Sequence, residues 1–124
     1  MEFQKDNTFI TGRMKSMTYA FQRAKKLITT EHSIMVQSSL GIVMTIAGFY
    51  FGISKTEWLF FFFSIGLVLS VEGLNTAIEK IADFIHPNYH EKIGFIKDIA
   101  AGAVFFAAMT AIVIGLIIYV PIFF

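Results

Sequence analysis

Three long stretches of the 124-residue chain lack charged side chains, and they limit the folds that it can adopt. Residues 33–54, 58–71 and 99–124 contain no Asp, Glu, Lys or Arg. Because an α-helix rises about 1.5 Å per residue, about 20 apolar residues cross the ~30 Å hydrocarbon core of a bilayer. A helix also satisfies its own backbone hydrogen bonds in lipid, so these stretches predict membrane-spanning helices.

The composition agrees with a membrane as the solvent of this chain. Hydrophobic residues make up 56% and charged residues 15% of the chain, and the mean hydropathy is +0.67. Too few polar side chains remain to cover the surface of a soluble domain. A net charge of +1 gives no basic field that would point to nucleic acid as a partner, and the lack of Cys excludes disulfides and thiolate metal sites.

Short polar segments set the expected element boundaries. Residues 55–57 (Lys-Thr-Glu) separate the first two apolar stretches, and the second stretch continues into polar sequence without a proline until Pro87. We therefore predict an all-α fold with a single membrane domain over residues 1–124. Its expected elements are an amphipathic surface helix at 8–30 and membrane helices at 33–54, 58–85 and 98–120.

The predicted surface helix has two distinct faces. Over residues 14–28, Met, Ala, Phe, Leu and Ile lie on one face, while Lys, Arg, Thr and Gln lie on the other. Such a helix is expected to lie in the headgroup plane, attracted to anionic lipid. Tyr19 is the aromatic residue on the polar side, and it either belongs to a simple anchor or faces a water-soluble ligand.

The distribution of Lys and Arg predicts the orientation in the membrane. Six of them precede the first span, one lies at 55–57 and three lie between residues 80 and 97. The positive-inside rule therefore places the amino terminus and the 80–97 connection in the cytoplasm. A cytoplasmic nucleotide would reach only these two segments.

Small residues recur every four positions in two of the predicted spans. This spacing lets helices approach closely in lipid, so it predicts packing and carries little information about function. The residues are Ala103, Ala107, Ala111 and Gly115 in the last span, and Gly48 and Gly52 in the first.

The second membrane helix carries a polar stripe that lipid should not tolerate. Five polar residues share an arc of about 100° on one face, namely Glu72, Asn75, Thr76, Glu79 and Asp83. Glu72 follows fourteen uncharged residues, and an unpaired charge at such a depth costs at least ~2.5 kcal/mol. Solvation at a helix end or pairing with a lysine would explain one acid, but explains the whole stripe less well.

Carboxylates two turns apart can divide the work of a phosphotransferase. One can accept a proton while another holds a hard cation such as Mg²⁺, which prefers oxygen ligands and keeps substrate phosphates in its shell. Glu31, between the surface helix and the first span, is a candidate second metal ligand. Lys97, beside Asp98 at the start of the last span, is a candidate for binding phosphate oxygens.

Two segments resemble a known family. EGLNTAIEKIAD at 72–83 and NYHEKIGFIKDIAAGAV at 88–104 are similar to the signature of the small prokaryotic diacylglycerol kinases, which include undecaprenol kinases. The resemblance implies a homotrimeric lipid kinase of the inner membrane that uses MgATP and shares its active sites between neighbouring subunits.

The resemblance also implies roles for individual residues. Glu72 matches the catalytic base, and Glu31 and Glu79 match the metal carboxylates. Asn75 and Asp83 match polar residues that line the site. The positions that match nucleotide contacts are Tyr19, Glu31, Glu79, Asn88, Tyr89, His90, Lys97 and Asp98.

The expected reaction is transfer of the ATP γ-phosphoryl group to diacylglycerol, giving phosphatidic acid, or to undecaprenol, giving undecaprenyl phosphate. Residues 101–104 (AGAV) look more like the undecaprenol branch, whereas Met35 replaces a basic residue common in that branch, so the acceptor stays open. The alternative is a non-enzymatic membrane protein, either an ion path or an assembly factor. An ion path predicts carboxylates across the whole bilayer, yet none occurs in 58–71 or after Asp98.

Overall fold

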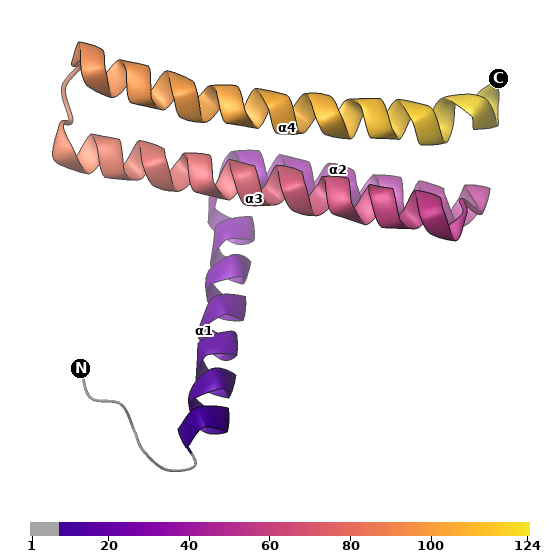
Figure 1. Cartoon of the computed structure of the whole chain (residues 1–124), viewed down its shortest axis with the longest axis horizontal. Helices are drawn as coiled ribbons and strands as arrows, with labels where there is room; N and C mark the ends of the chain where they lie inside the picture. Colours follow the sequence, from indigo (N-terminus) through magenta and orange to yellow (C-terminus); the bar gives the residue numbers. More distant parts are fainter. Residues whose placement is uncertain (1–7) are drawn as a thin grey trace.

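The computed structural model describes residues 8–124, with side chains from residue 9 onward. Four α-helices make up this part of the chain, and it contains no strand, as the sequence predicted (Figure 1). The helices are α1 (Thr8–Thr30), α2 (His32–Phe51), α3 (Lys55–Ile85) and α4 (Glu91–Phe123). The last three are long and apolar enough to cross a membrane.

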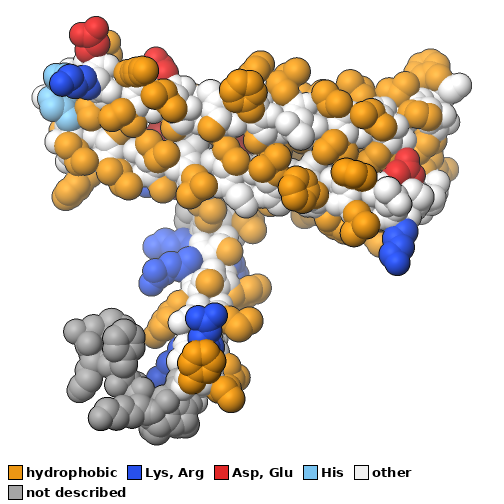
Figure 2. Space-filling view, in the orientation of Figure 1, with side chains coloured by type: hydrophobic (Ala, Val, Ile, Leu, Met, Phe, Trp, Pro, Cys, Tyr) orange, Lys and Arg blue, Asp and Glu red, His pale blue; other side chains and the backbone are white. Residues whose placement is uncertain are grey.

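The three apolar helices run side by side, whereas α1 runs across their direction (Figure 1). α3 packs most extensively against α4 and less against α2. On the face shown in Figure 2, charged side chains gather at the two ends of the bundle and along α1, and the middle of the bundle is almost entirely hydrophobic. This distribution matches a membrane-spanning bundle with polar ends.

The amphipathic helix predicted at 8–30 is α1, and it touches the bundle mainly through its carboxyl-terminal end. There Leu27 lies against Gly73 of α3, where an added Cβ atom would be 3.0 Å from Leu27 Cδ2. Farther along α1, Met17 and Phe21 are more than 70% exposed. Its apolar face is therefore free to enter the headgroup region of a membrane.

The turn between α2 and α3 is as short as the sequence predicted, but it lies three residues earlier. Gly52 adopts a left-handed conformation (φ 65°, ψ 51°) that ends α2. Ser54 and Glu57 then form a capping box, with hydrogen bonds of 2.9 and 3.2 Å to each other's backbone. The polar break at 55–57 is therefore the first turn of α3, which begins at Lys55 instead of residue 58.

The last helix is also longer than the predicted span at 98–120. It begins at Glu91, where His90 Nδ1 accepts a 3.1 Å hydrogen bond from the Lys92 backbone and caps the helix. It continues through Pro121 to Phe123, three residues beyond the predicted end at residue 120. Hydropathy identifies only the lipid-buried part of a helix. It does not detect the polar turns that precede this part.

A hydrophobic cluster joins the three apolar helices at the end that holds the α2–α3 turn. Its buried members are Ile53, Phe61, Ile118 and Tyr119. The Tyr119 hydroxyl also donates a 2.8 Å hydrogen bond to the Met44 carbonyl, which ties α4 to α2. Since the 55–57 turn is expected outside the cell, we call this the outer end of the bundle and the opposite end the inner end.

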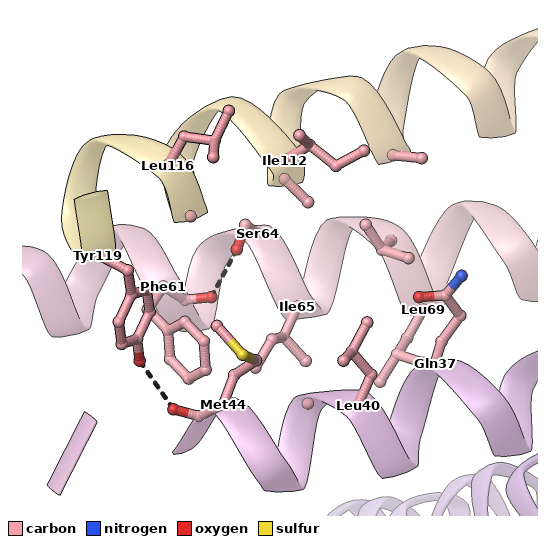
Figure 3. Close-up of a pocket in the computed structure, with 15 residues that line it drawn as sticks. Gln37, Leu40, Met44, Phe61, Ser64, Ile65, Leu69, Ile112, Leu116 and Tyr119 are labelled. Carbon is pink, nitrogen blue, oxygen red and sulfur yellow. Dashed lines mark hydrogen bonds between the residues drawn. The ribbon is translucent and has the colours of Figure 1, made fainter. Parts of the chain in front are cut away.

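Between this cluster and the inner end, α2, α3 and α4 line an apolar cavity of about 430 Å³ that is open along part of its surface (Figure 3). Its walls consist mostly of apolar side chains from all three helices.

The cavity changes the interpretation of the small residues. Ala107 of α4 is buried and Gly48 of α2 lies directly under Trp58, as close packing requires. Gly115, in contrast, faces open space, since no atom lies within 4 Å of a Cβ atom added there. Gly115 and Ala111 line the cavity. These two residues therefore leave open space where the sequence predicted close contact between helices.

Candidate active site

The polar stripe predicted on the second membrane helix lies along the second half of α3. Glu72 is buried, with 9% of its surface exposed, whereas the side chain of Asp83, three turns farther on, is 59% exposed. The stripe therefore leads from the interior of the bundle to its inner end. Glu72 is the member of the stripe that lies farthest from that end.

Glu72 lies in an apolar part of the bundle. Gly41 of α2 faces Ile65 of α3. Because the two helices are antiparallel, Ile34, seven residues before Gly41, lies at the level of Glu72, seven residues after Ile65. Ile34 is 1% exposed. Among residues 8–124, no ion pair and no side-chain hydrogen bond includes Glu72. Pairing with a lysine therefore does not account for this buried glutamate.

The next polar residues along the stripe form a hydrogen-bonded pair. Asn75 Nδ2 donates a 3.0 Å hydrogen bond to Glu79 Oε1, one turn farther along α3. The other amide atom, Asn75 Oδ1, is buried and has no partner. A buried acceptor without a donor is costly, so Oδ1 is an oxygen available to a cation or to a donor on a ligand.

Two ion pairs connect the second half of α3 to the neighbouring segments. Lys80 Nζ lies 3.3 Å from Glu31 Oε1 at the start of α2, and Lys97 Nζ of α4 lies 2.5 Å from Asp83 Oδ1. The side chains are 27–69% exposed, and ion pairs in such positions contribute about 0–1 kcal/mol. These charges can therefore exchange partners at little cost when a ligand arrives.

The structure brings some of the predicted nucleotide contacts to the inner end and leaves others apart. Glu79 belongs to the stripe itself, Lys97 of α4 contacts Asp83 of the stripe, and Glu31, the N-cap of α2, contacts Lys80 of α3. Tyr89 and Asp98 line a second pocket, which does not include those three residues. The other members of that pocket are Glu91, Gly94, Phe95 and Ile99.

Asn88 and His90 belong to the connection between α3 and α4. The Asn88 carbonyl lies 2.6 Å from His86 Nδ1, and His90 caps α4, so these groups shape the loop. Tyr19 lies on the exposed part of α1, eight residues or about 12 Å from the Leu27 contact. Within one chain, Tyr19 is therefore separated from the acidic stripe.

The donors fit a magnesium ion that is shared with a nucleotide. Within residues 8–124, no three His, Asp or Glu side chains are placed to hold a metal by themselves. Mg²⁺, however, is usually held by one or two carboxylates together with waters and substrate phosphates. Glu31 and Glu79 provide two carboxylates, because Glu31 contacts Lys80, the neighbour of Glu79, and Asn75 Oδ1 provides a free oxygen.

The sequence did not reveal two features of this site. Lys80 was not expected to pair with Glu31, and Lys97 was not expected to pair with Asp83. The partners come from different helices, so no local spacing connects them. Counting along the antiparallel helices from the contact of Gly48 with Trp58 places Glu31 at the level of Asn75, within about one turn of Glu79 and Lys80.

Comparisons of the sequence with known proteins point to one family. The sequence model of the prokaryotic diacylglycerol kinase family matches residues 18–119. The undecaprenol kinase of Bacillus subtilis is 36% identical over 107 residues, which are 86% of this chain and 87% of that protein. The diacylglycerol kinase of Haemophilus influenzae is 30% identical over 100 residues, covering 81% and 85% of the two chains.

A third relative, the diacylglycerol kinase of Escherichia coli, is 25% identical over 108 residues, which are 87% of this chain and 88% of that protein. The match of the family model includes α2, α3 and nearly all of α4, and therefore the whole polar stripe. The resemblance predicted from residues 72–83 and 88–104 is thus confirmed. The chain belongs to the prokaryotic diacylglycerol kinase family, a family of membrane lipid kinases.

Proposed function

We propose that this chain transfers the γ-phosphoryl group of MgATP to the hydroxyl group of a membrane lipid alcohol. The observation that carries the proposal is Glu72, a carboxyl group buried in a membrane-spanning helix without an ion-pair partner. A soluble kinase has no need of a base at this depth. A kinase with a lipid acceptor does, because the bilayer delivers its hydroxyl group at the boundary between hydrocarbon and water.

Glu72 is the group that accepts the proton from the lipid hydroxyl as its oxygen attacks the γ-phosphorus. The low exposure of Glu72, and of Ile34 at the same level of the bundle, would limit the access of water and therefore the competing hydrolysis of ATP. The base is fixed on α3, a rigid helix that packs against both neighbours, so the attacking oxygen is held in position.

Glu31 and Glu79 would hold the magnesium ion, with Asn75 Oδ1 as a further oxygen. Bound there, the ion would supply positive charge against the phosphate oxygens. Asn75 Nδ2 fixes the Glu79 carboxylate through its 3.0 Å hydrogen bond. The Glu31 carboxylate exchanges its exposed partner Lys80 for the cation at low cost.

Lys97 would neutralise the charge that develops on the transferred phosphoryl group. In the structure, its ammonium group is held by Asp83, which keeps it at the inner end of the stripe. Asp83 therefore lines the site by positioning Lys97, whose point charge can pass to a phosphate oxygen.

Tyr19, Asn88, Tyr89, His90 and Asp98 complete the proposed nucleotide contacts. α1 extends away from its own bundle (Figure 1), and in the proposed homotrimer Tyr19 would reach the site of a neighbouring subunit. We propose that this homotrimer lies in the inner membrane with a cytoplasmic amino terminus and shares its sites between subunits. The cationic face of α1 would then rest on the anionic cytoplasmic leaflet.

The acceptor is diacylglycerol or undecaprenol. The relatives include an undecaprenol kinase and diacylglycerol kinases, and both alcohols present a primary hydroxyl group at the membrane interface. The ion-path alternative gains nothing from the structure. The Ser64 hydroxyl of α3 donates to the Phe61 carbonyl of its own helix, so the outer half of α3 offers no continuation of the acidic stripe.

The test is transfer of labelled phosphate from ATP by the purified protein in mixed micelles that contain one alcohol at a time. We expect a labelled lipid with at least one alcohol, and no transfer when EDTA removes the divalent cation. Micelles without alcohol control for ATP hydrolysis. Absence of labelled lipid with both alcohols, in a protein that retains its helical spectrum, would refute the proposal.

A further inference from the structure

Lys80 is a charged residue of the inner end to which the proposed mechanism gives no contact with a substrate. It lies at the edge of the polar stripe of α3, directly after Glu79 and one turn after Thr76. Its ammonium group lies 3.3 Å from Glu31 Oε1, and its side chain is 69% exposed. This lysine therefore contacts a proposed metal ligand and is also accessible to a molecule that arrives from water.

The ion pair between Lys80 and Glu31 contributes little to the fold. Glu31 is the N-cap residue of α2, but within the described residues its side chain makes no capping hydrogen bond. The pair is exposed, and such pairs contribute about 0–1 kcal/mol. Both charged groups are therefore available for ligands.

The ammonium group of Lys80 lies at the depth of the proposed metal donors. Glu31 lies at the level of Asn75, five residues or about 7.5 Å before Lys80 along α3. Side chains of a helix lean toward its amino terminus, so the stem of Lys80 points back toward this level. Lys80 and Glu31 therefore meet between the levels of Asn75 and Lys80, which is the stretch of α3 that carries Glu79.

A second lysine is held one turn away on the same helix face. Lys97 of α4 pairs with Asp83, which follows Lys80 by three residues along α3. Side chains at this spacing leave a helix about 5–6 Å apart. Two ammonium groups thus lie beside the proposed magnesium ligands, and lysine binds phosphate oxygens as a point charge.

The charges of the inner end favour the use of both lysines for a nucleotide. MgATP carries net negative charge, because one divalent cation only partly neutralises a triphosphate. Each ammonium group that turns from a carboxylate to a phosphate oxygen lowers the repulsion between them. Carboxylates already outnumber ammonium groups along and beside the stripe, where the charged residues are Glu31, Glu72, Glu79, Lys80, Asp83 and Lys97.

We infer that Lys80 is a further nucleotide-binding residue, which passes from Glu31 to a phosphate oxygen of ATP when the Glu31 carboxylate takes up magnesium. Lys80 leaves Glu31 because an ammonium group and a divalent cation on one carboxylate repel each other. Its flexible stem lets the charge move to the phosphate while α3 stays in place. The inference rests on the proposed function, in which Glu31 and Glu79 hold the ion.

The first test measures the reactivity of Lys80 in the unmutated protein. Lysines of the full-length protein in micelles are labelled by limited reductive methylation, and the labelled peptides are quantified by mass spectrometry. We expect Mg²⁺ with saturating β,γ-methylene-ATP, which transfers no phosphate, to slow the labelling of Lys80 about threefold or more relative to Mg²⁺ alone. Lys55, an exposed lysine at the outer end of α3, is the internal control and should not change.

Equilibrium dialysis of the same analogue separates the two ways in which this test can fail. Binding of the analogue with an unchanged or faster rate at Lys80 would show that the ion only displaces the lysine, and would overturn the inference alone. No binding of the analogue would refute the proposed function together with the inference.

The second test compares three substitutions. Lys80→Met removes the charge and keeps most of the apolar stem, whereas Lys80→Arg keeps a charge that binds phosphate. Lys55→Met repeats the first change at the outer end of the same helix. With saturating Mg²⁺, we expect Lys80→Met to raise the Kd of the analogue and the KM for ATP about fivefold or more, with kcat changed less than about twofold. Lys80→Arg should recover most of the affinity, and Lys55→Met should keep all of it.

Other patterns would assign Lys80 differently. An unchanged or lower Kd of the analogue in Lys80→Met would show that this lysine only competes with the ion, and would overturn the inference. A fall in kcat without a change in KM or Kd would overturn it as well. A protein that binds the analogue through Lys80 but transfers no phosphate would refute the proposed function alone, since binding is measured without catalysis.

Discussion

The two ends of α3 are built for different purposes. At the outer end, a left-handed Gly52, a capping box and a hydrophobic cluster hold the helices together, with Trp58 stacked on Phe62 at a ring distance of 5.3 Å. At the inner end, exposed ion pairs and an unpartnered Asn75 oxygen replace such contacts. The comparison teaches that the fold is stabilised at one end, which leaves polar groups at the other end free for ligands.

The largest effect should come from Glu72, the buried acid of the inner half. Glu72→Gln removes the proposed base while preserving shape, so we expect phosphoryl transfer to fall about 100-fold or more. The matched control is Glu57→Gln, the same change in the capping box at the other end of the same helix, where an amide oxygen can still accept the hydrogen bond. Initial rates with saturating ATP measure both variants.

This pair of variants also tests whether the inner half of α3 serves catalysis and the outer end serves stability. Glu72→Gln should leave the temperature of thermal unfolding in detergent unchanged or slightly higher, because a buried ionisable group is removed. Normal turnover in Glu72→Gln, or an equal loss in Glu57→Gln, would contradict the assignment of the base.

Lys97 should have the next largest effect. Lys97→Met removes the ammonium group proposed to meet the phosphoryl oxygens, and we expect kcat to fall about 100-fold, as for loss of an oxyanion donor. Lys92→Met, an exposed lysine of the same helix, is the control. A variant that lost only affinity for ATP, with kcat unchanged, would show that Lys97 binds the nucleotide without stabilising the transition state.

A substitution at the outer end should affect stability instead of chemistry. A Cβ atom at Gly48 would lie 2.7 Å from the Trp58 ring, so Gly48→Ala forces this tightly packed contact apart. We expect a loss of about 1–3 kcal/mol in unfolding free energy, with kcat for the remaining folded protein unchanged. Denaturant titration in detergent measures the loss, and Gly66→Ala, where open space surrounds the glycine, controls for helix propensity.

The smallest effect on stability is expected at Lys80. Lys80→Met breaks the exposed pair with Glu31, and such pairs contribute less than about 1 kcal/mol. Magnesium would no longer compete with a lysine for Glu31, so the concentration of Mg²⁺ needed for half-maximal activity should fall by up to about fivefold. An increase in that concentration would instead show that Lys80 supports metal binding.

Periodicity and hydropathy were sufficient to predict the helices and the polar stripe. Uncharged stretches indicate helices because lipid leaves no other way to satisfy the backbone, and residues three and four apart share a helix face in any environment. The boundaries were less accurate, since hydropathy does not register polar turns such as those from Glu91 to Lys97. Capping signals extended α3 back to Lys55 and α4 back to Glu91.

The sequence alone determined that this chain is an all-helical membrane protein with an acid at an unfavourable depth, and its motifs assigned it to a kinase family. These properties depend on the local geometry of each helix and on the free energy of transferring its residues from water to lipid. Both are set within a single helix. Only the tertiary structure decided that Lys80 meets Glu31, that Tyr119 bridges to Met44 and that a cavity lies beside Gly115. Such features depend on the register and separation of packed helices, which no spacing within one segment encodes.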